Sequence, residues 1–101
     1  MNAFAALADP TRASIIEALA EGERTAGELV ALFPISQPAV SQHLRVLREA
    51  GLVIASKEAQ RRVYRLDARP LREIDRWLDS YRRFWAGKLD DLERHMDEEA
   101  P

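Results

Sequence analysis

The sequence predicts a mainly helical α+β fold that forms a single domain over residues 1–101. Three observations support this prediction. Before Gly51, apolar residues recur at helical spacing in segments with recognisable first and last residues. After Gly51 they alternate as in β-strands, and from about residue 71 they return to steps of three and four. The predicted order is therefore helices, a β-hairpin and one long closing helix.

Length and composition limit the classes of protein to consider. A chain of 101 residues suits one domain, and 47% hydrophobic with 32% charged residues is typical of a folded protein. The sequence has no cysteine, which excludes disulfides, thiolate metal sites and cysteine nucleophiles. No apolar run could span a bilayer, and the opening MNAFAALADP lacks the features of a secretory signal. We therefore expect a cytoplasmic protein that does not associate with membranes.

The first two helices are predicted from local patterns. About residues 1–8 should form a short helix in which NAFAAL places Phe4 and Leu7 on one side. The next segment, ADPTRASIIEALAEG, begins with Asp9, which can cap free backbone amides, and with Pro10 at the first helical position. These features predict a short helix followed by a longer and better-delimited one.

The following two helices form a predicted helix-turn-helix over residues 25–50. TAGELVALFP opens with a capping box in which Thr25 and Glu28 each satisfy the other's backbone amide. Ser36 is the expected N-cap of the second helix, residues 37–50. Only about three residues separate the two helices, which is the spacing of a helix-turn-helix.

A two-stranded β-hairpin, the wing, is predicted over residues 52–66. LVIASK and RVYRL are rich in β-branched and aromatic residues, and the short polar stretch EAQR connects them. Pro70 is expected to open the last helix, which would run over residues 71–96 and extend about 39 Å. The order helix, helix, turn, helix and hairpin predicts a winged helix-turn-helix with a long C-terminal helix.

The helix at residues 37–50 has two chemically different sides. Val40, Leu44 and Leu47 cluster within one turn of the helical wheel. The outward side carries amides, a hydroxyl and guanidinium groups, namely Gln37, Ser41, Gln42, Arg45 and Arg48. Glutamine can pair with adenine edges, arginine with guanine and serine with either bases or phosphates, in a major groove about 12 Å wide that admits one helix. The outward side therefore has the chemistry of a DNA-reading surface.

Charge is divided along the chain, although the net charge is only −2. Residues 36–66 carry six basic and two acidic side chains, whereas residues 67–101 carry seven basic and ten acidic ones. This division indicates a local contact with an anionic partner. Charge alone would also fit a solvated helix and hairpin that are rich in arginine.

These segments also carry a family resemblance. ALADPTRASIIEAL, TAGELVALFPISQPAVSQHLRVLREAGLV and RRVYRL together resemble the ArsR-type winged-helix transcriptional repressors, over nearly all of residues 4–66. The resemblance implies a homodimeric repressor with a DNA-reading helix at residues 37–50, a wing at residues 52–66 and a dimer contact made by the first and last helices. It places the following residues at the DNA: Ser36, Gln37, Ser41, Gln42, His43, Arg45, Arg61 and Arg62.

Two residues within the resemblance have alternative interpretations. His43 could contact a phosphate, or it could satisfy a hydrogen bond at the edge of the core. Ala59 stands at the wing tip where the family commonly has a glycine, so the conformation of the tip stays open.

The resemblance is to members of the family without a metal site. The stretch TAG, residues 25–27, lies where metal-sensing members carry cysteine, and it contains no such donor. Near the start of the last helix, four acidic residues alternate with arginines and are better explained by surface ion pairs, namely Asp67, Glu73, Asp75 and Asp79. We therefore expect neither a metal-responsive switch nor a cofactor.

The last helix carries more apolar surface than a small domain can cover. Two tryptophans, a tyrosine and a phenylalanine fall within ten residues, and such side chains are costly to leave exposed. We therefore expect this helix to pack on a second copy of the chain as well as on its own domain. Some of the aromatics could instead line a pocket for a small hydrophobic effector. The expected dimer interface comprises Phe4, Leu7, Ile74, Trp77, Leu78, Tyr81, Phe84, Trp85, Leu89 and Leu92.

The leading hypothesis is a sequence-specific repressor that binds a pseudo-palindromic DNA operator as a homodimer. Arg45 would carry most of the base discrimination. Phosphate contacts would come from the wing cations Lys57, Arg61 and Arg62. The alternative is a winged-helix module that binds protein, which should present apolar anchors, and only Pro38 and Val46 are candidates for that role. An enzyme is disfavoured, because the sequence lacks a histidine–carboxylate constellation and a glycine-rich phosphate loop.

Overall fold

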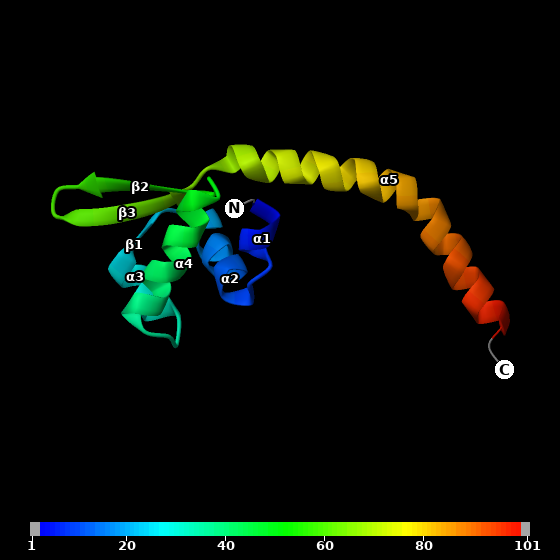
Figure 1. Cartoon of the computed structure of the whole chain (residues 1–101), viewed down its shortest axis with the longest axis horizontal. Helices are drawn as coiled ribbons and strands as arrows, with labels where there is room; N and C mark the ends of the chain where they lie inside the picture. Colours follow the sequence, from blue (N-terminus) through cyan, green and yellow to red (C-terminus); the bar gives the residue numbers. More distant parts are fainter. Residues whose placement is uncertain (1–2, 100–101) are drawn as a thin grey trace. The chain divides into compact units, whose positions relative to one another are not determined.

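The structure of the protein, a computed structural model, describes residues 3–99 as five helices and three strands. The chain forms two compact units, one that ends at Leu71 and one that begins at Arg72. The first unit contains the helix-turn-helix and the hairpin, and the second contains most of the last helix (Figure 1). The predicted mainly helical α+β class is confirmed.

Three of the four helices of the first unit begin where a side chain caps free amides. The Asp9 carboxylate accepts a hydrogen bond from the backbone N–H of Arg12 at 3.0 Å. The Thr25 hydroxyl accepts from the Glu28 amide at 3.2 Å, while the Glu28 carboxylate accepts from the Thr25 amide at 3.1 Å, which confirms the capping box. The four helices are α1 (Ala3–Leu7), α2 (Pro10–Ala20), α3 (Ala26–Leu32) and α4 (Gln37–Glu49), of which the last three have these caps. Residues 1 and 2 of the expected first helix lie outside the described residues.

The end of α4 depends on one glycine. Gly51 adopts φ +78°, a left-handed conformation that only glycine takes without strain. Its N–H donates to the Arg48 carbonyl at 2.9 Å, and the Leu52 N–H donates to the Leu47 carbonyl at 3.0 Å. This Schellman arrangement satisfies the last carbonyls of the helix and turns the chain into the hairpin.

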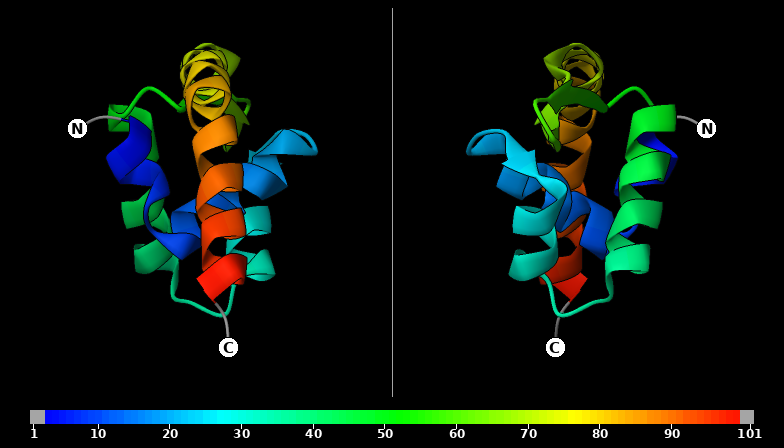
Figure 2. Two further views of the ribbon diagram at one scale, coloured as in Figure 1. Left: turned by 90° about the vertical axis from the view of Figure 1, so that its right-hand side faces the viewer. Right: turned by 90° about the vertical axis from the view of Figure 1, so that its left-hand side faces the viewer.

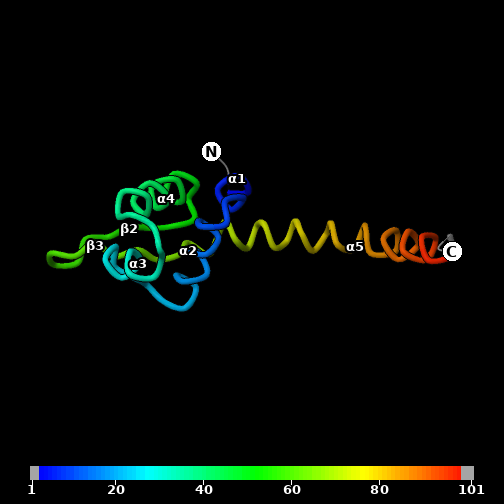
Figure 3. The backbone as a smooth tube through the Cα atoms, turned by 90° about the horizontal axis from the view of Figure 1, so that it is seen from below, coloured from blue at the N-terminus to red at the C-terminus, as the bar shows by residue number. Residues whose placement is uncertain are grey.

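The sheet has three strands rather than the two predicted. They are β1 (Arg24–Thr25), β2 (Val53–Glu58) and β3 (Arg61–Leu66), antiparallel in the order β1-β3-β2. The two residues of β1 carry no strand pattern of their own and pair only because the chain before α3 passes β3. The hairpin of β2 and β3 projects beyond β1 and α3 (Figures 1 and 3).

The wing tip is tighter than the predicted EAQR connection. Glu58 pairs with Arg61 across the strands, so only Ala59 and Gln60 connect them. Ala59 has φ +56°, the conformation for which glycine is preferred. A two-residue turn fixes the register of every side chain along the hairpin.

One hydrophobic core joins the helices and the sheet of the first unit. Its largest fully buried side chains come from α2, α3, α4 and the start of the hairpin, namely Ile15, Leu29, Leu44, Leu47, Leu52 and Val40. The short helix α1 contributes Ala6 to this core and packs beside both α2 and α4 (Figure 2). Leu7, expected at the dimer contact, is half-buried and packs against this core.

The last helix, α5 (Ala68–Glu99), is longer at both ends than the predicted residues 71–96. The Asp67 carboxylate accepts a hydrogen bond from the Arg69 amide at 3.1 Å, so Asp67 caps the helix. Pro70 therefore lies inside the first turn, where its missing N–H costs nothing. No helix among residues 3–99 combines the length and the apolar character that crossing a membrane requires.

Candidate nucleic-acid interface

The orientation of α4 is set by its buried side. Val40, Leu44 and Leu47 are at most 1% exposed, so α4 cannot rotate without exposing them. The Ser36 hydroxyl accepts a hydrogen bond from the Ala39 N–H at 3.3 Å, which confirms Ser36 as the N-cap. The opposite side of α4 must therefore face away from the core.

That outward side presents polar groups at successive turns. Gln37, Ser41, Gln42 and Arg45 are all exposed. A guanidinium nitrogen of Arg45, Nη2, donates a 2.8 Å hydrogen bond to Oε1 of Gln42. The bond holds an amide and a guanidinium side by side, and the remaining N–H groups of both side chains point to solvent as donors for an acceptor-rich edge.

Three further side chains of α4 differ from the simple outward pattern. Val46, a candidate anchor for a protein partner, is buried at 8% exposure, and its assignment to the outward face is wrong because it lies next to Leu47 on the core side. Arg48 is half-buried, and its Nε is shielded without a hydrogen-bond partner in the described part of the chain. His43 is also half-buried, and its Nδ1 lies 3.9 Å from Asp9 Oδ2.

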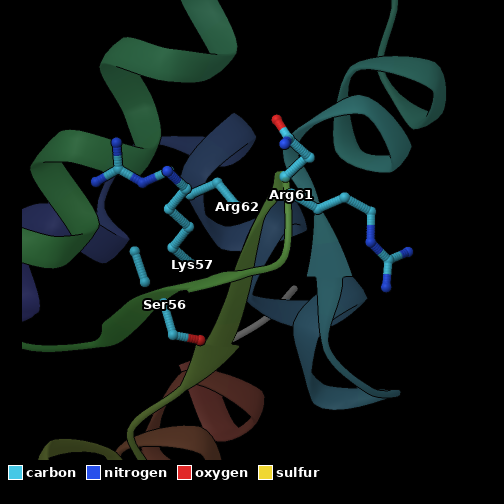
Figure 4. Close-up of a pocket in the computed structure, with 6 residues that line it drawn as sticks. Ser56, Lys57, Arg61 and Arg62 are labelled. Carbon is cyan, nitrogen blue, oxygen red and sulfur yellow. The ribbon is translucent and has the colours of Figure 1, made fainter.

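The wing has two chemically different faces. Lys57 lies directly across the strands from Arg62, whereas Arg61 lies across from Glu58. Side chains alternate along a strand, so Lys57 and Arg62 share one face and Arg61 lies on the other. Figure 4 shows Lys57 and Arg62 on one side of the hairpin and Arg61 on the opposite side.

The Lys57–Arg62 face is an electrostatic match for an anion. Two like charges directly opposite each other destabilise a hairpin, and a bound anion would reverse that effect. Arg62 lies over the Tyr64 ring, with its Cζ atom 5.7 Å from the ring centroid. The face belongs to an open hollow of about 380 Å³ that is lined by Ala55, Ser56, Lys57, Gln60, Arg61 and Arg62.

The proposed dimer residues of α5 form an exposed apolar stripe. Phe84 and Leu89 are 60% and 58% exposed, and Leu92 is similar. Four of the residues, which we call the aromatic ridge, contact one another along the helix: Trp77, Tyr81, Phe84 and Trp85. The ring centroids of Trp77 and Tyr81 are 5.0 Å apart, and those of Phe84 and Trp85 are 5.3 Å apart. Phe4 of α1 is exposed to a similar degree.

The acidic residues near the start of α5 pair with arginines, as predicted for three of the four. Asp67 lies 2.7 Å from Arg69, and Asp79 lies 3.0 Å from Arg83. Asp75 lies 3.7 Å from Arg82. Within residues 3–99, no group of three or more histidine and acidic side chains is placed to hold a metal ion.

Sequence reasoning missed two features of the site. Lys57 and Arg62 lie opposite each other because the turn between the strands has only two residues. The predicted four-residue connection EAQR did not define which residues of the two strands pair. Arg12 was assigned no role, because nothing in ADPTRAS indicates that its side chain would reach α4. Only a three-dimensional arrangement of α1, α2 and α4 makes that contact visible.

Comparisons with known proteins agree with this geometry. Residues 9–55 match the family model described as bacterial regulatory protein, arsR family. The HTH-type transcriptional regulator Rv2034 of Mycobacterium tuberculosis is 45% identical over 98 residues, which cover 97% of this chain and 89% of that protein. The transcriptional repressor SdpR of Bacillus subtilis is 35% identical over 77 residues, which cover 76% and 86% of the two chains. A crystal structure of a possible transcriptional regulator for arsenical resistance covers 100% of this chain and 99% of its own, with 40% identity and a TM-score of 0.75.

The matched region runs from the N-cap of α2 into β2 and thus contains the whole helix-turn-helix. The relatives are transcriptional regulators, which are not enzymes. The similarity of this chain to Rv2034 and to SdpR covers most of the length of each of those proteins and extends beyond the helix-turn-helix. The chain belongs to the ArsR family of bacterial transcriptional regulators.

Proposed function

We propose that the protein is a homodimeric, sequence-specific DNA-binding repressor that reads the major groove with α4. One observation carries this proposal: α4 buries Val40, Leu44 and Leu47 while Ser41, Gln42 and Arg45 face solvent. A helix held by its apolar side and exposing hydrogen-bonding groups on the other meets the steric and chemical needs of groove recognition. The relative SdpR is a transcriptional repressor, which supports repression rather than activation.

Base discrimination and phosphate binding would be divided between α4 and the wing. Arg45 and Gln42 present donors and acceptors in the fixed geometry that base edges require. Lys57 and Arg62 would bind the DNA backbone, because their like charges favour an anion between them. Arg61 would contribute less to phosphate binding, because the negative charge of Glu58 lies directly across the strands from it.

Dimerisation would be provided by the apolar stripe of α5. The aromatic ridge and the leucines that follow it are exposed in one chain, and a second copy would remove them from water. Two-fold pairing would place two copies of α4 in successive major grooves, about 34 Å apart.

A fluorescence anisotropy titration with a random duplex at low salt tests the proposal. The account predicts binding that weakens steeply with added salt, because phosphate contacts release counterions. The alternative, a winged-helix module for a protein partner, predicts little binding under the same conditions. Of the two candidate apolar anchors on the outward side of α4, Val46 is buried and only Pro38 is exposed, which disfavours that alternative. Absence of binding at low salt would contradict the proposal.

A further inference from the structure

The side chain of Arg12 lies where three helices of the first unit meet. Its Nε donates a hydrogen bond to the Ala6 carbonyl at 2.6 Å, and its Nη2 donates to the Ala5 carbonyl at 3.5 Å. Both carbonyls belong to the last turn of α1, and the Ala5 carbonyl also accepts the Ala8 backbone N–H at 3.3 Å. Arg12 therefore caps the C-terminal end of α1 from the first turn of α2.

The same guanidinium also reaches α4. Its Nη1 lies 3.5 Å from Nδ1 of His43, whose side chain is only 21% exposed. Arginine can only donate hydrogen bonds, so Nδ1 must accept, and a neutral His43 then carries its proton on Nε2. His43 is directly followed in α4 by the buried Leu44 and directly preceded by the exposed Gln42.

Asp9 completes the junction from the N-cap of α2. Its Oδ2 accepts the Arg12 backbone N–H and lies 3.9 Å from His43 Nδ1. The hydrogen bond from the Arg12 backbone N–H, together with the charge of the Arg12 guanidinium, holds the pKa of the Asp9 carboxyl below its usual value. Asp9 thus places a carboxylate between the start of α2 and His43 of α4.

We propose that Arg12 is a positioning residue for DNA recognition, which links the last turn of α1 to α4 through His43. The role rests on the proposed function, in which α4 reads the groove and α1 contributes Phe4 to the dimer contact. A shift of α1 would move two hydrogen-bond acceptors of Arg12, and Arg12 would transmit the shift to the turn of α4 that carries Gln42. Arg12 itself touches no DNA in this scheme.

Specific and random duplexes distinguish a positioning role from plain stabilisation. A lysine at position 12 can still bond one acceptor but cannot reach α1 and His43 together. Arg12→Lys should therefore lower affinity for a duplex selected from a random library by roughly 2- to 30-fold, the range expected for a coupling residue. Affinity for a random duplex should stay within about twofold, because backbone contacts carry it. Arg24→Lys is the matched control, since Arg24 lies in the same unit and pairs with Glu21 at the other end of α2 from Arg12.

A double-mutant cycle with His43→Ala tests whether Arg12 acts through His43. Arg12→Lys should have little further effect in the His43→Ala background, because the link is already broken. His43→Ala should itself lower specific affinity more than random affinity, whereas a direct phosphate contact by His43 would lower both equally. The selective loss expected for His43→Ala alone keeps the proposal testable if Arg12→Lys is poorly folded.

A spectroscopic measurement checks the hydrogen bond itself. The ¹⁵N chemical shifts of the imidazole should report the Nε2–H form of His43 in the wild type and a mixture of both neutral forms in Arg12→Lys. His95 is exposed and should be unaffected, which provides an internal reference. An unchanged His43 spectrum in Arg12→Lys, additive effects in the cycle, or equal losses on both duplexes would overturn the positioning role. A wild-type protein that bound no duplex would overturn DNA binding itself, and the two failures are therefore distinguishable.

Discussion

Helices α4 and α5 show how one amphipathic pattern can have two different outcomes. Both carry apolar side chains at steps of three and four with charged residues between them. In α4 these side chains are buried, with Leu44 and Leu47 almost completely removed from water. In α5 the corresponding side chains, such as Phe84 and Leu89, are more than half exposed.

The difference teaches where each helix finds its partner. The apolar side of α4 is satisfied within its own unit, and its polar side is free for another molecule. The apolar side of α5 is exposed in the single chain, and in our proposal a second chain covers it. The charged residues of α5 pair with one another, as in Arg83 with Asp79. The periodicity of a helix predicts that an apolar side will be covered, but not by which molecule.

The largest effect should come from truncating the two apolar sides in turn. Leu47→Ala should destabilise the first unit by about 2–5 kcal/mol, because it opens a cavity in a closed core. Leu89→Ala should change the free energy of unfolding only through dimerisation, and its effect should vanish at low protein concentration. Urea unfolding at several concentrations measures both. A concentration-independent loss of several kcal/mol in Leu89→Ala would show that the stripe is covered within the chain.

A charge on the stripe should separate the subunits. Leu89→Asp should weaken dimerisation by about 2 kcal/mol or more, because burying an unpaired carboxylate at an interface is costly. Arg76→Asp is the control: it places a carboxylate on the side of α5 opposite Trp85, where it stays in water. Sedimentation analysis measures the monomer–dimer equilibrium. Equal effects of the two substitutions would contradict the proposed interface.

Within the first unit, Arg45 and Arg62 should differ in kind. Arg45→Ala should cost about 1–3 kcal/mol on a selected duplex and little on a random one. Arg62→Ala should weaken both duplexes alike and reduce the slope of log affinity against log salt by about one. Anisotropy titrations at several salt concentrations test both variants. Identical behaviour of the two would disprove the division between α4 and the wing.

The wing tip offers a smaller, stabilising change. Ala59→Gly should raise the free energy of unfolding by up to about 1 kcal/mol, because glycine adopts φ +56° without the clash that alanine suffers. Gln60→Gly is the control, since Gln60 has no positive φ and should lose stability from added backbone entropy. Thermal unfolding distinguishes the two. A destabilised Ala59→Gly would mean that the tip is not strained.

The smallest effect should be the pH dependence of the α3 capping box. The Thr25 backbone N–H donates a hydrogen bond to the Glu28 carboxylate. This bond, the Thr25 side chain and the positive charges of Arg24 and Arg61 lower the pKa of Glu28 below its ordinary 4.5. Ionised Glu28 therefore stabilises the fold above that pH, and the stabilisation is lost as pH falls through the folded-state pKa. Glu28→Gln keeps the hydrogen bond without the titration, so wild type and variant should differ near pH 7 and converge in acid. Urea unfolding across this pH range measures the difference in the free energy of unfolding between wild type and Glu28→Gln. A difference that does not change with pH would contradict the stabilising role of ionised Glu28.

Much of the fold could be predicted because the relevant physics is local. The caps at Asp9, Thr25 and Ser36 use neighbouring amides, and Gly51 ends α4 through its own backbone. The outward side of α4 followed from the spacing of its buried residues. Val46 was assigned to the outward side in error. It lies at the border of the apolar side, where the angle on a helical wheel does not show whether a side chain is buried.

The remaining features depend on contacts that are distant in sequence. Strand β1 exists only through its pairing with β3, and the opposition of Lys57 and Arg62 depends on the register of the hairpin. The contact between Arg12 and His43 joins residues 31 positions apart. None of these leaves a periodic trace in the sequence, so a pattern-based prediction had no means of finding them.

The central claim is that α4 reads DNA while α5 joins two chains. The most direct measurement is the mass, by analytical ultracentrifugation, of the complex formed with a duplex selected by the protein from a random library. The account predicts two chains on one duplex whose half-sites are inverted repeats about one helical turn apart. A single chain per duplex, or a selection that enriches no inverted repeat, would contradict it.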